Sequence, residues 1–207
     1  RREYTKSNPF VVLLGKGDHQ ITSTWTTSYG FEYMHATTLG ITCSNITFLG
    51  QGKDTTTILG GFAIVNQENV SFKNMTVTNT SALGNGIHMR IAKVELIDVA
   101  LKGCEDAALH NVMHIPGSNS GSYLVATRCE FANSEIGVAM ECTHSLSSAK
   151  LTNCLFYGNE EDGIYGYDST IHLHGEDTAI HSNGDCGIDI HVGKVIIHLP
   201  SHHNTFY

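Results

Sequence analysis

Apolar and polar residues alternate with a period of two along most of this chain. The alternation is clear in VSFKNMTVTN (70–79), VELIDVALKG (94–103), YLVATRCEFAN (123–133) and KLTNCLFYGN (150–159). Such alternation is typical of β-strands with one buried face. The longest apolar run covers residues 10–14 and is too short to span a bilayer. The pattern predicts an all-β chain without membrane insertion.

Short segments of similar sequence recur about every 24 residues, a period that indicates stacked units. NSEIGVAM begins at Asn133, NEEDGIYG at Asn159 and NGDCGIDI at Asn183, and GCEDAALH at Gly103 is a degenerate copy. Asn tolerates a left-handed backbone and can bond neighbouring backbone groups. We therefore predict a solenoid with Asn79, Asn133, Asn159 and Asn183 at its corners.

Aligning the repeats places like residues in columns. One column holds Met75, Val99, Cys129 and Cys154, and the next holds Val77, Leu101, Phe131 and Phe156. In a parallel coil such columns become inward stacks with a spacing of about 4.8 Å. A second strand follows each corner, within residues 86–90, 107–111, 137–141, 163–167 and 187–191.

These patterns predict a single-stranded right-handed parallel β-helix of about seven rungs. We expect one domain over residues 1–207, with amino-terminal rungs in 1–61 and regular repeats in 62–207. Because the repeat pattern runs up to Tyr207, we also expect the natural chain to continue beyond it. The ends of a solenoid expose strand edges, which predicts a protein partner or cap there.

The amino-terminal rungs have their own signature. VVLLGKGDHQI (11–21) and NITFLGQGKDTTTILGG (45–61) each read as a strand, a glycine turn and a strand. Together with the Asn-to-Gly-Ile rungs, they resemble the pectin-lyase-like superfamily of right-handed parallel β-helices, with its carbohydrate-binding and sugar-hydrolysis repeats. The resemblance covers residues 10–204 and implies the fold. It implies no single activity, because its motifs are structural.

Within that superfamily, LKGCEDAALH (101–110) resembles the G-Y-Q-D-T-L-Y segment of pectin methylesterases. The resemblance places Asp106 on the catalytic acid and Glu105 beside it. The family's next motif, D-F-I-F-G, is replaced by SEIGVAM (134–140), and its G-R-x-W has no match. A single carboxylate cannot serve as both nucleophile and acid. The alternative interpretation makes Asp106 a turn residue.

The second strands predict a polar surface. If Ile87, Val138, Ile164 and Ile188 point inward, alternation sends the intervening residues outward. We call these outward residues the second-strand strip: His88, Arg90, Glu141, Tyr165, Tyr167, Asp189 and His191. Aromatic rings stack on sugar rings, and charged groups bond directionally to hydroxyls. The strip is thus a candidate substrate-binding surface, and the alternative is an ordinary solvated face.

Three histidines form a candidate metal site. TIHLHG (170–175) buries Ile171 and Leu173 and sends His172 and His174 outward, and VIIHL (195–199) sends His198 outward. A step of 24 residues stacks His198 on His174. Three imidazoles can bind zinc or copper, while the alternative is three solvated side chains. Zinc is therefore the candidate cofactor, with copper as the alternative metal.

Composition narrows the function further. The net charge of −8 argues against a nucleic-acid partner, which requires a basic surface. Two function classes remain: a non-catalytic or degenerate polysaccharide-binding module, or a structural solenoid of a virion, cell surface or larger assembly. Both favour an extracellular, cell-surface or virion location over the cytoplasm. An esterase, lyase or hydrolase with an unrecognised site is a third alternative, although the missing catalytic motifs favour a non-enzyme.

Overall fold

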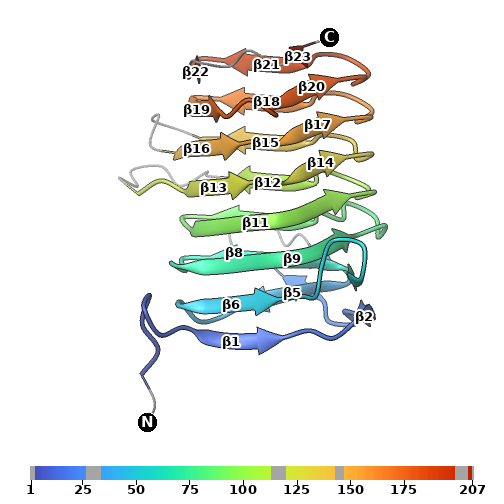
Figure 1. Ribbon diagram of the computed structural model, residues 1–207, viewed down its shortest axis with the longest axis vertical. Helices are drawn as coiled ribbons and strands as arrows, with labels where there is room; N and C mark the ends of the chain where they lie inside the picture. The colour runs from blue at the N-terminus through green and yellow to red at the C-terminus, as the bar shows by residue number, and fades with distance from the viewer. Residues whose placement is uncertain (1–2, 27–33, 113–119, 143–146, 199–204, 207) are drawn as a thin grey trace.

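The chain forms a stack of parallel β-strand rungs in the computed structural model, which describes residues 3–26, 34–112, 120–142, 147–198 and 205–206. The rungs follow one another along the long axis, from the amino-terminal end to the carboxy-terminal end (Figure 1). All secondary structure in the described residues is β, as the alternation predicts. No helix in this part of the chain has the length and apolar content that a membrane span requires.

The strands form two large sheets and one hairpin. The first-strand row of the fourteen-stranded sheet comprises β1 (Phe10–Leu13), β6 (Ile46–Leu49), β9 (Val70–Thr78), β11 (Lys93–Lys102), β13 (Tyr123–Thr127), β16 (Ser147–Thr152), β19 (Ser169–His174) and β22 (Lys194–Ile197). The same sheet bends into a second row with the ends of β9 and β11 and with β2 (Gly17–Gln20), β7 (Thr56–Leu59), β14 (Glu130–Ala132), β17 (Leu155–Tyr157), β20 (Ala179–His181) and β23 (Thr205–Phe206).

The seven-stranded sheet contains one strand from each complete rung. Its members are β5 (Thr38–Ile41), β8 (Gly61–Val65), β10 (Ile87–Arg90), β12 (Leu109–Val112), β15 (Val138–Glu141), β18 (Ile164–Tyr167) and β21 (Ile188–His191). The hairpin pairs β3 (Trp25–Thr26) with β4 (Met34–His35) in antiparallel fashion. Seven strands in this sheet confirm the prediction of about seven rungs.

The predicted inward stack forms the core. Leu101 pairs with Val77 on one side and Phe131 on the other, and Phe131 pairs with Phe156. All four side chains are fully buried. The Phe131 and Phe156 rings lie nearly parallel with centroids 5.1 Å apart, so each aromatic ring buries one face of the next. The column read from the sequence is therefore confirmed.

The predicted asparagine corners differ from expectation by one residue. Asn133 lies level with Gly158, and Ser134 takes the position level with Asn159. The corner after Phe131 is one residue shorter than the corner after Phe156, which displaces Asn133 relative to Asn159 while the strands on either side stay in register. Asn133 adopts the left-handed backbone with φ 51°. Asn159 acts through its side chain instead, because its Nδ2 donates to Oδ1 of Asn183 at 2.9 Å in the next rung.

One loop makes a contact with a rung that is not adjacent to its own. We call residues 50–55, between β6 and β7, the strap; it runs along the stack beside β9 (Figure 1). The carbonyl of Lys53 accepts a hydrogen bond from Thr76 at 2.8 Å, and its Nζ reaches Oε1 of Glu130 at 2.6 Å. Burial acts to raise the pKa of Glu130, but the hydrogen bond and charge of Lys53 outweigh it and lower that pKa.

The first strand exposes apolar side chains. Phe10 is 42% exposed, Val11 43% and Leu13 71%. Strand β1 pairs with β6 on one side. The predicted protein partner at the ends of the solenoid stays a prediction.

Replacing Phe131 with Ala should lower the free energy of unfolding by about 3–5 kcal/mol, because it removes a buried aromatic side chain from a close-packed stack. Urea denaturation followed by circular dichroism measures the loss. Phe10→Ala is the matched control at an exposed phenylalanine and should cost much less. Equal costs at the two positions would contradict the inward stack.

Replacing Glu130 with Gln should lower stability at pH 7 by about 1 kcal/mol, because the strap loses its ion pair. A carboxyl with a lowered pKa stabilises the fold above its ordinary pKa of 4.5, and this contribution is lost as the pH falls through the folded-state value. The difference from wild type should therefore vanish in acid. Denaturation at several pH values measures it, with exposed Glu176→Gln as the control. A pH-independent difference would contradict the ion-pair explanation.

Candidate functional site

The second-strand strip lies on the outer surface of the seven-stranded sheet. Glu141 of β15 pairs with Tyr167 of β18, and Tyr167 pairs with His191 of β21. Tyr165 pairs with Asp189 in the neighbouring column. Tyr167 is 43% exposed, and the rings of Tyr165 and His191 lie 6.0 Å apart. The structure thus brings these five predicted residues together on three adjacent rungs.

The other two residues of the strip lie deeper than expected. His88 and Arg90 of β10 are each only 9% exposed. The Trp25 ring, from the β3–β4 hairpin, lies 5.5 Å from the His88 ring and contacts Gly40 closely enough that a Cβ there would clash. The hairpin therefore covers the amino-terminal part of the strip. The accessible part lies around Tyr167.

Charged groups on this sheet are paired within it. His110 of β12 lies 3.6 Å from Glu141, and His191 lies 3.1 Å from Asp189. The neighbouring His110 imidazole lowers the pKa of Glu141 despite the opposing effect of burial. Desolvation, followed by the charges of Glu141, Asp189 and other groups, raises the pKa of Tyr165. Tyr165 therefore sits in a locally negative field.

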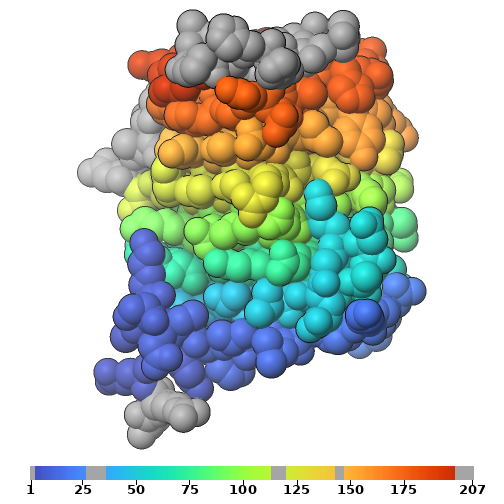
Figure 2. Space-filling view, in the orientation of Figure 1, coloured from blue at the N-terminus to red at the C-terminus, as the bar shows by residue number. Residues whose placement is uncertain are grey.

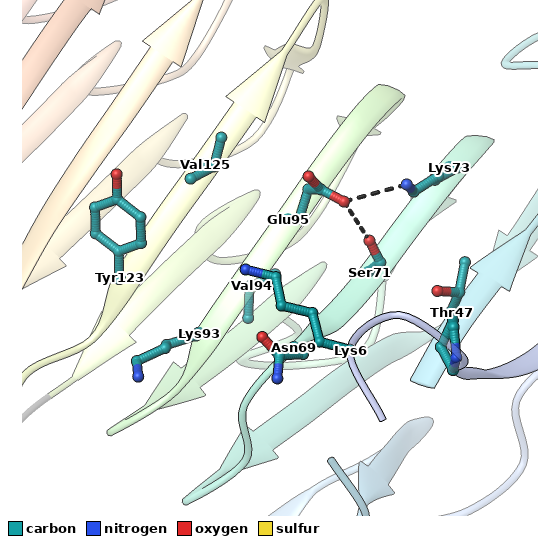
Figure 3. A pocket seen from close by; sticks show the side chains of 11 residues that line it. Lys6, Thr47, Asn69, Ser71, Lys73, Lys93, Val94, Glu95, Tyr123 and Val125 are labelled. Carbon is teal, nitrogen blue, oxygen red and sulfur yellow. Dashed lines mark hydrogen bonds and ion pairs between the residues drawn. The ribbon is translucent and has the colours of Figure 1, made fainter. Parts of the chain in front are cut away.

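A hollow of about 260 Å³ lies on a different face of the solenoid, over the first-strand row. Its lining includes Lys6, Lys73, Lys93, Glu95 and Tyr123, and Figure 3 shows these side chains around one depression. Lys6 comes from the amino-terminal segment, which stands against this face (Figure 2, blue). Tyr123 is 43% exposed, as much as Tyr167. We call this hollow the lysine hollow.

Two of the three lysines of the lysine hollow are paired with carboxylates. Glu95 accepts a hydrogen bond from Ser71 at 2.7 Å and pairs with Lys73 at 3.1 Å (Figure 3). Burial acts to raise the pKa of Glu95, but these two contacts outweigh it and lower that pKa. Lys93 pairs with Glu68 at 2.9 Å. The hollow offers a basic and aromatic surface, although two of its lysines already have carboxylate partners.

The three predicted metal ligands meet at the other end of the same row. His172 Nδ1 lies 2.9 Å from His198 Nε2, and the rings of His174 and His198 stack with centroids 3.8 Å apart. One ligand atom from each of the three lies within 4.8 Å of the others. Desolvation, then the charges of His198 and nearby lysines, lowers the pKa of both His172 and His174.

Glu105 and Asp106 lie at a corner. The amide of Glu135 donates to the carbonyl of Asp106, and Asp106 Oδ2 accepts a hydrogen bond from Asn85 at 3.2 Å. Desolvation and the surrounding carboxylates raise the pKa of Glu135. The carboxylates therefore stack along the corner on successive turns, and Asp106 has the contacts of a turn residue. Its predicted catalytic role stays a prediction.

Sequence reasoning missed two parts of these surfaces. The first part consists of two residues on the seven-stranded sheet face. His110 contacts Glu141 in the neighbouring column of side chains, and Trp25 covers His88. The second is the lysine hollow. Period-two alternation sends Lys93 and Tyr123 outward, and repeat alignment places them side by side, as their pairing shows. The positions of Trp25 and Lys6 follow from no repeat, because both residues lie in segments outside it.

The stacked three-strand rungs define a right-handed parallel β-helix. Among solved structures, pectate lyase Pel9A matches with a TM-score of 0.60, at 14% identity over 84% of this chain. ORF18 of Geobacillus virus E2 matches with a TM-score of 0.42 and 13% identity over 90% of the chain, covering 51% of ORF18.

The A-module of mannuronan C-5 epimerase AlgE4 from Azotobacter vinelandii matches with a TM-score of 0.38 and 12% identity over 92% of this chain and 68% of the module. The chain spans 46% of the length of Pel9A. No protein-family model matches the chain, and no curated protein matches its sequence. At these identities the likeness to Pel9A defines the fold and not the activity.

Proposed function

We propose that this chain is a non-catalytic carbohydrate-binding module that holds a polysaccharide on the accessible part of the second-strand strip. The observation that carries the proposal is the grouping of Tyr165 and Tyr167 with Asp189 and His191 on adjacent strands. Aromatic faces supply stacking surfaces for sugar rings, and the charged groups beside them supply directional hydrogen bonds to hydroxyls.

The spacing of the tyrosines suits a chain of sugar rings. Residues two apart on a strand lie about 7 Å apart along it, and neighbouring rungs are about 4.8 Å apart. Tyr167 and His191 on successive rungs therefore form a line along the solenoid, with Glu141 continuing it. A polysaccharide can follow this line over several rungs of a rigid surface.

The local charges favour a neutral polysaccharide. Glu141, Asp189 and Asp162 all act on Tyr165 as negative charges. A polyanion laid across the tyrosines would meet this field, whereas a neutral glycan would use the same carboxylates as hydrogen-bond acceptors. An acidic polysaccharide would fit the lysine hollow better, so the two faces make opposite predictions about the ligand.

The shared fold supports a polysaccharide as the ligand but does not bear on its charge. Pel9A is a pectate lyase on the same architecture, and an elongated parallel solenoid offers a long flat face to a linear polymer. The absence of the pectin methylesterase partner motifs from the sequence is the reason to propose binding without catalysis.

Binding of neutral oligosaccharides tests the proposal. Cellohexaose and xylohexaose are screened first, and then a wider glycan panel that includes oligogalacturonate. Each stacking contact contributes about 1 kcal/mol, so Tyr167→Ala should weaken neutral glycan binding about five-fold in isothermal titration. The melting temperature should stay unchanged, because Tyr167 is exposed. Fluorescence of Trp25, the one tryptophan of the chain, offers a second readout from the hairpin that packs against His88 of this sheet.

Tyr123→Ala is the matched control, since Tyr123 is equally exposed on the first-strand row. It should leave neutral glycan binding unchanged. Weakening by Tyr123→Ala alone, with oligogalacturonate as the ligand, would move the site to the lysine hollow and overturn the proposal. A complete lack of glycan binding would favour the structural solenoid.

A further inference from the structure

We propose that His172, His174 and His198 bind one divalent transition-metal ion, with zinc, copper and nickel as the class of ligand. The site lies on the first-strand row, away from the second-strand strip, and the proposal is independent of the polysaccharide. It rests on the convergence of three imidazoles, two from β19 and one from His198, the residue that follows β22.

The fold fixes the directions of all three side chains. The side chains of Ile171 and Leu173 in β19 are buried in the core, so alternation turns His172 and His174 of the same strand outward on one face. The amide of His198 donates to the carbonyl of Leu173 at 3.0 Å, which holds His198 level with His174. The cluster is therefore positioned by backbone pairing rather than by loops.

The separations suit a small ion. A tetrahedral zinc ion with bonds of about 2.0–2.1 Å to nitrogen separates two ligand atoms by about 3.3 Å. The His172 and His198 nitrogens lie 2.9 Å apart, and the His174 ring stacks against that of His198 at 3.8 Å. The three rings are stacked nearly parallel, and His172 and His198 are hydrogen-bonded, so binding an ion requires side-chain torsions that turn the rings until one nitrogen of each faces a common centre. Backbone pairing keeps each residue at its strand position during that change.

The donor set selects the metal. Three imidazoles without a carboxylate suit zinc, copper and nickel and are poor ligands for calcium and magnesium, which prefer oxygen. Lys150 is paired in register with His172, and Lys194 follows on β22 beside Thr170. These lysines bring positive charge, so a bound ion would complete its coordination with water or an anion rather than a protein carboxylate.

Metal titration of the untagged full chain tests the proposal. Isothermal titration with zinc chloride, and separately with copper chloride, at pH 7.5 in a non-chelating buffer should give one saturable equivalent per chain. Zinc should also raise the melting temperature, because an ion that binds the folded state stabilises it. Calcium chloride should give neither effect. Cobalt chloride should give the visible absorption bands of a site with nitrogen ligands.

The variants separate this site from scattered surface histidines. His174→Ala and the more conservative His174→Gln should each weaken zinc binding at least ten-fold and abolish the rise in melting temperature. His181→Ala, at a partly exposed histidine of β20 outside the cluster, should bind zinc as the wild type does. No saturable binding, or equal weakening by His181→Ala and both His174 variants, would overturn the proposal.

Discussion

In-register parallel pairing between successive rungs is the constraint on which the rest of this structure depends. Each strand pairs with the strand one rung away, so a residue meets its counterpart at a fixed separation of about 4.8 Å. Because side chains alternate between faces, a slip of one residue would exchange inward and outward sets. The Leu101–Phe131–Phe156 stack, the second-strand strip and the histidine cluster are all consequences of the same register.

That constraint explains what could be predicted from the sequence. Alternation shows which residues face inward, and the repeat shows which rungs bring them together, so the Phe131 stack and the proximity of His174 to His198 were both predictable. The corner at Asn133 was misaligned, because a turn shorter by one residue leaves the strands in register but shifts the Asn. The burial of His88 under Trp25 and the position of Lys6 at the lysine hollow were not predictable, because Trp25 and Lys6 lie in segments outside the repeat.

The solenoid presents different chemistry on different faces. Tyrosines and carboxylates lie together on the seven-stranded sheet, while lysines and histidines gather on the first-strand row. A third edge carries stacked corner carboxylates, including Glu135. Parallel paired strands form the backbone of both sheets, so the outward side chains set what these two faces can bind. The fold shared with Pel9A is accordingly compatible with very different ligands.

The strap alters the mechanics of the stack. In a solenoid, each rung normally contacts only its two neighbours, so structural loss can spread one rung at a time from either end. Lys53 belongs to the second rung and forms an ion pair with Glu130 of the fifth rung, with β9 and β11 between them. Peeling away any rung within this span must also release the strap. The Lys53–Glu130 contact therefore couples rungs two to five, and fraying within that span carries the added free-energy cost of breaking it.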